Sequence, residues 1–254
     1  PTRRGARYFY FRNTGLQNQS VMYVADSPRG EARVLLDPNT LRADGTEALS
    51  STSLSEDGSM LGYGVASGGS DWQEFRIREV ATGRDLPDRL RWIKFSGMTW
   101  TKDGKGFFYS RYAQPEGNVL TAAVRNHKVY YHRAGTPQEQ DVLVYERPDQ
   151  PDFLINSSVT EDGRYLVINL SQGSDRRNRV HVMDLGDPMK PRVQGTVVRM
   201  LDDGDASYGV IGNEGPVFFV QTDKDAPRGK VVAVGLDNPA PASCGGRKVD
   251  EHGY

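Results

Sequence analysis

The stretch TEDGRYLVINL, residues 160–170, decides the fold of this chain because its pattern recurs along the sequence. An Asp-Gly turn leads into a run of aromatic and β-branched residues, which is typical of a turn that feeds a buried strand. The close copies are SEDGSMLGY (55–63) and TKDGKGFFY (101–109), and the looser copies are RGARYFYF (4–11) and NEGPVFFV (213–220). The sequence therefore contains several units of one kind.

The spacing of these units indicates the architecture. The glycine of each turn serves as a marker, and the markers are Gly5, Gly58, Gly104, Gly163 and Gly215, with steps of 53, 46, 59 and 52 residues. Turn-and-strand units about fifty residues apart are typical of a β-propeller with one unit per blade. No segment shows the 3.6-residue period of an amphipathic helix over a normal helix length. We therefore expect an all-β fold.

The pattern predicts a partial, open β-propeller of about five four-stranded blades over residues 1–238, with units starting near the five marker glycines. The fifth unit breaks off after about two predicted strands, at 217–221 and 230–236, so we do not expect a closed ring. Each terminal blade would lack one neighbour, which leaves an apolar face uncovered. Residues 239–254 have no strand pattern, and we expect them to form a disordered tail.

Charge and cysteine content exclude several classes of protein. The 254 residues include 32 basic and 33 acidic side chains, a net charge of −1, and no block of like charge. Nucleic acid and anionic membranes are therefore poor partners, and no apolar run approaches the roughly twenty residues of a membrane span. The single cysteine, Cys244, excludes an intrachain disulfide and fits a reducing compartment. The first residue is Pro1 rather than methionine, so we expect the true N-terminus to be missing.

The sequence contains no catalytic or cofactor motif that we can identify. A serine hydrolase places its nucleophile on a Gly-x-Ser-x-Gly turn, and no such turn occurs. The histidines are His127, His132, His181 and His252, whose spacings fit no metal motif. We expect His132 and His181, which lie within strand patterns, to be structural. We expect no cofactor and no metal, and from the residues alone the chain is a non-catalytic propeller arc whose loops are available to bind a ligand.

Three features have both a functional and a purely structural interpretation. Ser70-Asp71-Trp72 places a carboxylate and an indole at a loop tip, or else it is a turn-capping aspartate with a packing tryptophan. Phe95, at the mouth of a strand, either lines the propeller tunnel or packs in the core. The loop 171–178 either faces a ligand or is simply solvated.

Several motifs of the chain closely resemble the propeller region of the prolyl oligopeptidase (prolyl endopeptidase) family. They are NTGLQNQ (13–19), LDPN (36–39), GSDW (69–72), KFSGMTW (94–100) and KVYYH (128–132), and their order and spacing match along residues 4 to about 238. The resemblance implies a cytosolic serine peptidase that cuts short peptides after proline. It also implies a seven-bladed propeller, of which this chain would be a fragment, that caps an α/β-hydrolase domain carrying the catalytic triad. The propeller excludes large folded substrates, and this fragment alone should be inactive.

The resemblance also implies roles for particular residues. Phe95 falls at the position of an aromatic residue that lines the substrate pocket from the propeller side. Asp71, beside Trp72, falls at an acid that faces the hydrolase domain, near an arginine that holds the substrate backbone.

Three further positions match the pocket of the family. Leu154 falls at an apolar position usually held by methionine, and Ser174 falls at a pocket cysteine. Ser171 falls where animal enzymes carry an arginine, a departure that removes a charge from the outer subsites. This departure puts any preference for long or acidic peptides in doubt.

Two functions follow as hypotheses. The first is the substrate-gating propeller of a cytoplasmic prolyl endopeptidase, with short proline-containing peptides and the missing α/β-hydrolase domain as partners, and with neither nucleic acid nor membrane among them. The alternative is a non-catalytic β-propeller that acts as a protein-interaction scaffold.

Overall fold

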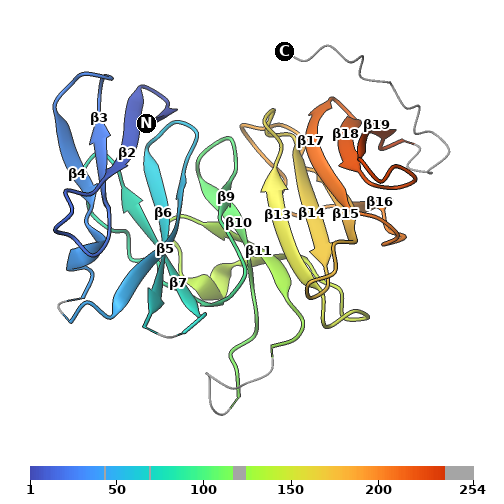
Figure 1. Ribbon diagram of the computed structural model, residues 1–254, viewed down its shortest axis with the longest axis horizontal. Coiled ribbons are helices and arrows are strands. Elements are labelled where there is room, and N and C mark those ends of the chain that lie inside the picture. The colour runs from blue at the N-terminus through green and yellow to red at the C-terminus, as the bar shows by residue number, and fades with distance from the viewer. Residues whose placement is uncertain (43, 69, 117–123, 238–254) are drawn as a thin grey trace.

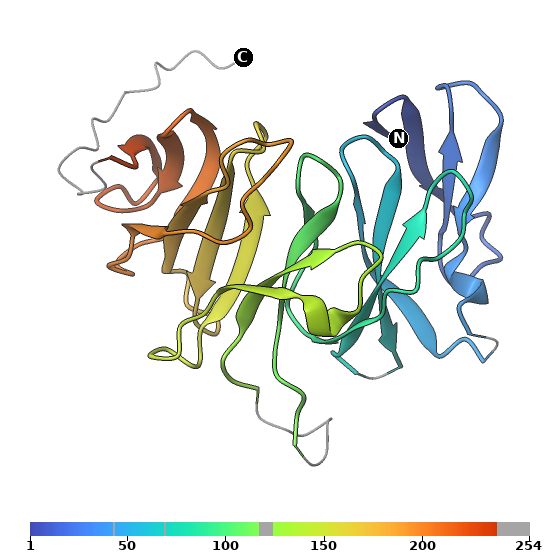
Figure 2. The same ribbon diagram turned by 180° about the vertical axis from the view of Figure 1, so that it is seen from behind.

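The computed structural model describes residues 1–42, 44–68, 70–116 and 124–237. Within these residues the fold is all-β, apart from two short 3-10 helices, η1 (Pro38–Thr40) and η2 (Gln138–Gln140). Five antiparallel sheets follow one another along the chain and stand side by side as the blades of an open arc (Figures 1 and 2). The expected partial β-propeller is confirmed.

Each blade contains consecutive strands joined as hairpins, so neighbours in sequence are neighbours in the sheet. Blade 1 contains β1 (Thr2–Arg4), β2 (Arg7–Arg12), β3 (Val21–Ala25) and β4 (Ala32–Leu36). Blade 2 contains β5 (Glu47–Leu54), β6 (Met60–Ser67), β7 (Gln73–Glu79) and β8 (Leu90–Ile93). Blade 3 contains β9 (Thr99–Trp100), β10 (Gly106–Arg111), β11 (Lys128–Arg133) and β12 (Val142–Tyr145). Blade 4 contains β13 (Leu154–Val159), β14 (Tyr165–Ser171), β15 (Asn178–Asp184) and β16 (Val197–Leu201), and blade 5 contains β17 (Tyr208–Glu214), β18 (Val217–Thr222) and β19 (Lys230–Gly235).

The marker glycines all occupy the same place, the turn between the first and second strand of a blade. Each has a positive φ, between 54° and 77°, which glycine adopts without the steric cost that a Cβ imposes. Each blade therefore begins one strand before its marker. The prediction that these turns lead into buried strands is confirmed in blades 2, 3 and 4, whereas β2 and β18 of the end blades are only partly buried. We call this end of the arc the turn end.

The recurrent Ser/Thr-x-Asp-Gly sequence is explained by a side-chain network that closes the turn. In blade 4 the Thr160 hydroxyl donates to Oδ1 of Asp162 (2.6 Å) and accepts from the amide of Tyr165 (3.0 Å). Oδ1 of Asp162 also accepts from the backbone amide two residues later, at 3.0 Å. The hydroxyls of Ser55 and Thr101 donate likewise to Asp57 and Asp103 in blades 2 and 3, and each of these aspartates accepts from the backbone amide two residues later.

The core is divided among the seams between neighbouring blades. Four apolar clusters fill the seams 1/2, 2/3, 3/4 and 4/5, and each draws its buried side chains mainly from the two sheets that it joins. At the 4/5 seam, for example, the rings of Tyr165 and Phe218 pack edge-on with centroids 5.3 Å apart. Because a middle blade is covered on both sides, its second strand is apolar on both faces, which explains the continuous run in TEDGRYLVINL.

Among the described residues, the two end blades are covered on one face only, as expected. In blade 5 the side chains of Phe218 and Val220 are buried against blade 4, whereas Phe219 is half-buried and Val217 is 37% exposed. In blade 1 the outward rings of Tyr10 and Tyr23 are half-buried and stack on each other with centroids 5.6 Å apart. Alternation along a strand places successive residues on opposite faces, so each end sheet presents one apolar face outward.

The prediction that the fifth unit has about two strands was wrong, because blade 5 has a third strand, β17. Its sequence, YGVIGNE, contains two glycines and two polar residues, and its register shifts between Val210 and Gly212. Glycine and asparagine are depleted in strands, and a bulge interrupts the alternation on which the strand prediction depends.

Candidate functional site

All six site residues predicted from the sequence lie at the end of the arc opposite the turn end, which we call the loop end. Because successive strands of a blade run in opposite directions, every second connection returns to this end (lower edge of Figure 1). Asp71 and Trp72 follow β6, Phe95 follows β8, Leu154 begins β13, Ser171 ends β14, and Ser174 lies in the next loop.

Phe95 is exposed to solvent, and its backbone has a strained, left-handed conformation. Its side chain is 53% exposed, which excludes the core-packing interpretation, and its φ is 55°. Trp92, three residues earlier, has a φ of 63°. The left-handed region is unfavourable for bulky residues, and such strain persists only where the surroundings enforce it, often at ligand sites.

An aromatic group supports the Phe95 segment. Trp72 packs edge-on against Trp92 and Tyr112, with centroids 5.8 Å and 6.1 Å away, and Nζ of Lys94 lies 4.5 Å from the centroid of a Trp72 ring. The Trp72 amide is capped by the Ser70 hydroxyl at 3.1 Å. The geometry therefore gives Trp72 a packing role, while the neighbouring Asp71 is exposed at the loop end.

The structure pairs two of the proposed pocket residues and connects a third to them through hydrogen bonds of neighbouring residues. Leu154 and Ser171 are direct partners across the β13–β14 pair. Phe95 is linked to Leu154 through their chain neighbours, because the backbone amide of Ser110 donates to Oγ of Ser96 (2.7 Å) and the Ser110 hydroxyl donates to the carbonyl of Ile155 (2.5 Å). Ser174, in contrast, is exposed in the β14–β15 loop, and no bond joins it to this group within the described residues.

A buried histidine completes the group. Nδ1 of His127 accepts from the amide of Ile155 at 3.1 Å, and its ring stacks on Tyr112 with centroids 4.5 Å apart. Only 1% of His127 is exposed, and burial lowers the pKa of this imidazole to about 4. His127 is therefore neutral near pH 7, with its proton on Nε2, because Nδ1 must accept.

The sequence analysis missed Ser96, Ser110 and His127 as members of this site. A signal was present at Ser110, which is one polar residue at the end of the buried run Phe-Phe-Tyr and is itself 1% exposed. Buried hydroxyl groups require a partner, so a buried serine among aromatics indicates a specific hydrogen bond. The other strand histidines, His132 and His181, are fully buried at seams, in keeping with their predicted structural role.

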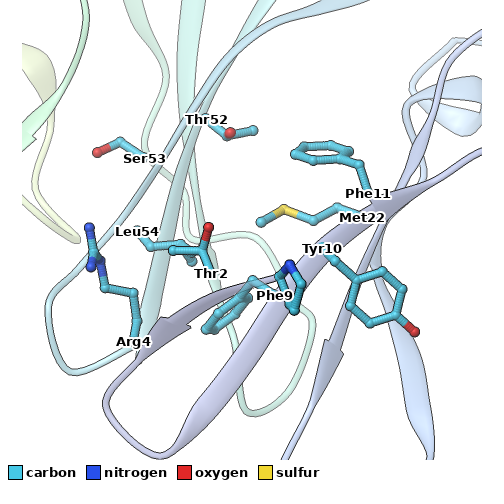
Figure 3. Close-up of a pocket in the computed structure, with 10 residues that line it drawn as sticks. Thr2, Arg4, Phe9, Tyr10, Phe11, Met22, Thr52, Ser53 and Leu54 are labelled. Atoms are coloured by element: carbon cyan, nitrogen blue, oxygen red, sulfur yellow. The ribbon is translucent and has the colours of Figure 1, made fainter. Parts of the chain in front are cut away.

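A cavity of about 500 Å³ lies elsewhere, between the first strands of blades 1 and 2 (Figure 3). Thr52, Ser53 and Leu54 of β5 face Phe9, Phe11 and Met22 of blade 1 across it. It lies beside residues 10–12 of β2, which β1 does not pair. None of the predicted site residues lines this cavity.

Comparison with known proteins identifies the family. Residues 1–253 match the family described as prolyl oligopeptidase, N-terminal beta-propeller domain. The chain belongs to this family. Its propeller resembles that of Galerina marginata prolyl oligopeptidase B, whose structure was solved with a 35mer hydrolysis and macrocyclization substrate. The two structures have a TM-score of 0.83 and 30% sequence identity, and the match covers 92% of this chain and 35% of that chain.

Curated members of the family show the same partial overlap. Prolyl oligopeptidase A of Amanita bisporigera is 34% identical over 92% of this chain and 34% of its own length. Prolyl endopeptidase of Elizabethkingia meningoseptica is 35% identical over 94% of this chain and 33% of its own length. This chain therefore spans about a third of the length of these relatives.

Two kinds of feature are absent from the described residues. No helix among the described residues is long and apolar enough to cross a membrane. In the same parts of the chain, no group of three or more His, Cys, Asp or Glu residues is arranged to hold a metal ion. Cys244, His252 and the predicted tail 239–254 lie outside the described residues.

Proposed function

We propose that this chain is the substrate-gating part of the propeller of a prolyl endopeptidase that hydrolyses short peptides after proline. The catalytic Ser, Asp and His would be supplied by an α/β-hydrolase domain that sits over the loop end, and the chain alone would be inactive. Phe95 is the observation that carries this proposal. A phenylalanine that is half-exposed on left-handed backbone costs stability, so a ligand contact gives a reason for it.

The remaining predicted residues have places in this proposal. Leu154 and Ser171, side by side across two strands, would form the pocket wall next to Phe95. Ser174 would contribute from the adjoining loop. Asp71 would face the hydrolase domain, with Trp72 holding its loop against blade 3 through Tyr112.

Charge supports the proposed partners and location. The near-neutral balance of charges gives no attraction for nucleic acid or anionic membranes, and a single cysteine is compatible with the cytoplasm. Short proline-containing peptides are the proposed substrates, and no cofactor is needed for hydrolysis by a serine triad.

A graft tests the proposal. Residues 1–237 would replace the homologous segment of the Elizabethkingia meningoseptica prolyl endopeptidase, and kcat/KM would be measured with a short reporter cleaved after proline. We expect cleavage that a serine-directed inhibitor abolishes, and no cleavage by the isolated chain. A folded graft whose hydrolase domain reacts with that inhibitor but cleaves no proline reporter would overturn the proposal and favour the scaffold hypothesis.

A further inference from the structure

We propose that Ser110 and His127 are positioning residues that set the distance between two walls of the substrate pocket, Phe95 and Leu154, and so determine how well proline fits between them. This inference rests on the proposed function. Both residues lie in blade 3, between the loop that carries Phe95 and the strand that begins with Leu154.

Ser110, in β10, forms hydrogen bonds next to both walls, one through its backbone amide and one through its hydroxyl. Its backbone amide donates to Oγ of Ser96, which follows Phe95 in the chain, and its hydroxyl donates to the carbonyl of Ile155, which follows Leu154. The hydroxyl is buried, so water does not replace the bond to Ile155. Phe95 and Leu154 are thus each one residue away from a hydrogen bond to the same serine.

His127 holds the other polar group of Ile155. Its Nδ1 accepts from the Ile155 amide, so both backbone groups of this residue are bound by side chains of blade 3. Two bonds at one residue fix the beginning of β13 against rotation as well as translation. Because Leu154 is adjacent, its side-chain direction follows from these bonds.

A chain of aromatic contacts also links His127 to the segment that carries Phe95. The ring of His127 stacks on Tyr112, whose ring meets Trp72, and Trp72 packs against Trp92 and Lys94 in the segment that leads to Phe95. The Tyr112 amide also donates to the carbonyl of Trp92 at 3.0 Å. These contacts support the left-handed backbone at Trp92 and Phe95. A substitution at His127 should therefore shift both Phe95 and Leu154.

A misplacement of either wall should weaken the binding of proline more than it slows the chemical step. Neither Ser110 nor His127 reaches the loop surface, so neither acts on the reacting atoms. The expected result is a rise in KM for the proline reporter with kcat nearly unchanged, together with a loss of preference for proline over alanine.

Kinetics of the graft provide the first test. Ser110→Ala removes only the bond to Ile155, and we expect it to raise KM for the proline reporter about five- to tenfold. Ser55→Ala is the matched control, since Ser55 is also fully buried and hydrogen-bonded but lies at the turn end. His127→Leu should act like Ser110→Ala, and His127→Asn, which keeps an acceptor near the position of Nδ1, should restore most of the affinity.

A second measurement uses the chain itself and does not depend on catalysis. In NMR spectra of the isolated chain labelled at Phe rings and Leu methyl groups, Ser110→Ala should shift the signals of Phe95 and Leu154, whereas Ser55→Ala should leave both unchanged. If Ser110→Ala and Ser55→Ala affect KM equally in an active graft, the inference is overturned while the proposed function stands. If the graft is inactive but the NMR shifts occur, the positioning stands and the proposed function fails. Unchanged Phe95 and Leu154 signals in Ser110→Ala overturn the inference in either case.

Discussion

Nε2 of His132 in blade 3 lies 2.7 Å from Oδ1 of Asp88 in blade 2. The other ring nitrogen, Nδ1, lies 2.6 Å from Oδ1 of Asp141, and none of the three side chains is exposed. Burial lowers the pKa of His132, but its hydrogen bonds to the two carboxylates outweigh burial, and the net pKa is raised above its usual 6.5. The imidazole therefore bridges two carboxylates, one of blade 2 and one of blade 3, across the 2/3 seam.

This bridge predicts a pH-dependent stability. A histidine whose pKa is higher in the folded state contributes stability that is complete below its unfolded pKa of about 6.5 and is lost as pH rises through the folded value. We expect the difference in free energy of unfolding between the wild type and His132→Gln to shrink as pH rises above about 6.5, measured by urea denaturation.

His181→Gln provides the control, because burial lowers the pKa of His181 in the folded state. Its contribution is present above the unfolded pKa and is lost as pH falls below about 6.5. The two variants should therefore show opposite trends with pH. Parallel trends would contradict the assignment of charge at the 2/3 seam.

Strain at Phe95 predicts a stabilising substitution. Phe95→Gly removes the cost of left-handed backbone at φ 55°, whereas Phe95→Ala removes the same ring and keeps that cost. We expect the glycine variant to be more stable than the alanine variant by about 1 kcal/mol in the free energy of unfolding. Equal stability of the two variants would mean that the backbone there is not strained in solution.

The exposed ring of Phe95 predicts a binding defect in the graft. Phe95→Ala should raise KM for a proline reporter with little change in kcat, because the substrate contact proposed for Phe95 takes no part in the reaction. Leu16→Ala is a suitable comparison, since Leu16 is a 93% exposed apolar residue in a loop of blade 1. An unchanged KM in Phe95→Ala would argue against the pocket assignment.

Alanine substitutions at different glycines should lower the stability of the fold by different amounts. At Gly163 a Cβ would meet Cβ of Lys102 at 2.7 Å, and φ is 77°, so both crowding and backbone strain oppose the change. At Gly215 φ is 54° but nothing lies within 4 Å, and at Gly212 neither obstacle exists. Thermal melts should therefore rank Gly163→Ala below Gly215→Ala, with Gly212→Ala close to wild type and a strain cost of about 1–2 kcal/mol at Gly215.

The open face of blade 5 predicts self-association. Phe219 points away from blade 4, and replacing it with threonine should reduce concentration-dependent sedimentation without lowering the melting temperature much. Phe218→Thr changes the adjacent residue on the buried face and should destabilise the fold by about 3 kcal/mol or more. A wild-type chain that sediments as a monomer at every concentration would contradict this prediction.

The blade repeat could be predicted from the sequence because the constraint that produces it is local. A glycine at positive φ, a hydroxyl three residues before it and an aspartate beside it are all visible within one turn, as in Thr160, Asp162 and Gly163. Strand β17 could not be predicted, because its pairing with β18 compensates for a sequence with little intrinsic strand preference.

The site was only partly predictable for a related reason. The family resemblance pointed to Phe95 and Leu154, and the structure places both at the loop end. The link between them depends on Ser110, 15 residues from one and 44 from the other, and on a contact between blades 3 and 4. A sequence pattern predicts where a strand lies and which of its residues share a face. It does not predict which side chain of a neighbouring sheet will contact that strand.

The separate clusters at the four seams have an evolutionary consequence. Since each sheet makes its apolar contacts mainly with the sheets beside it, an exchange of genetic material at an inter-blade loop disturbs two junctions at most. Whole blades can therefore be recombined between related genes while substitutions in the intact blades are retained. Such shuffling would let the loops at the loop end diversify faster than the sheets that carry them.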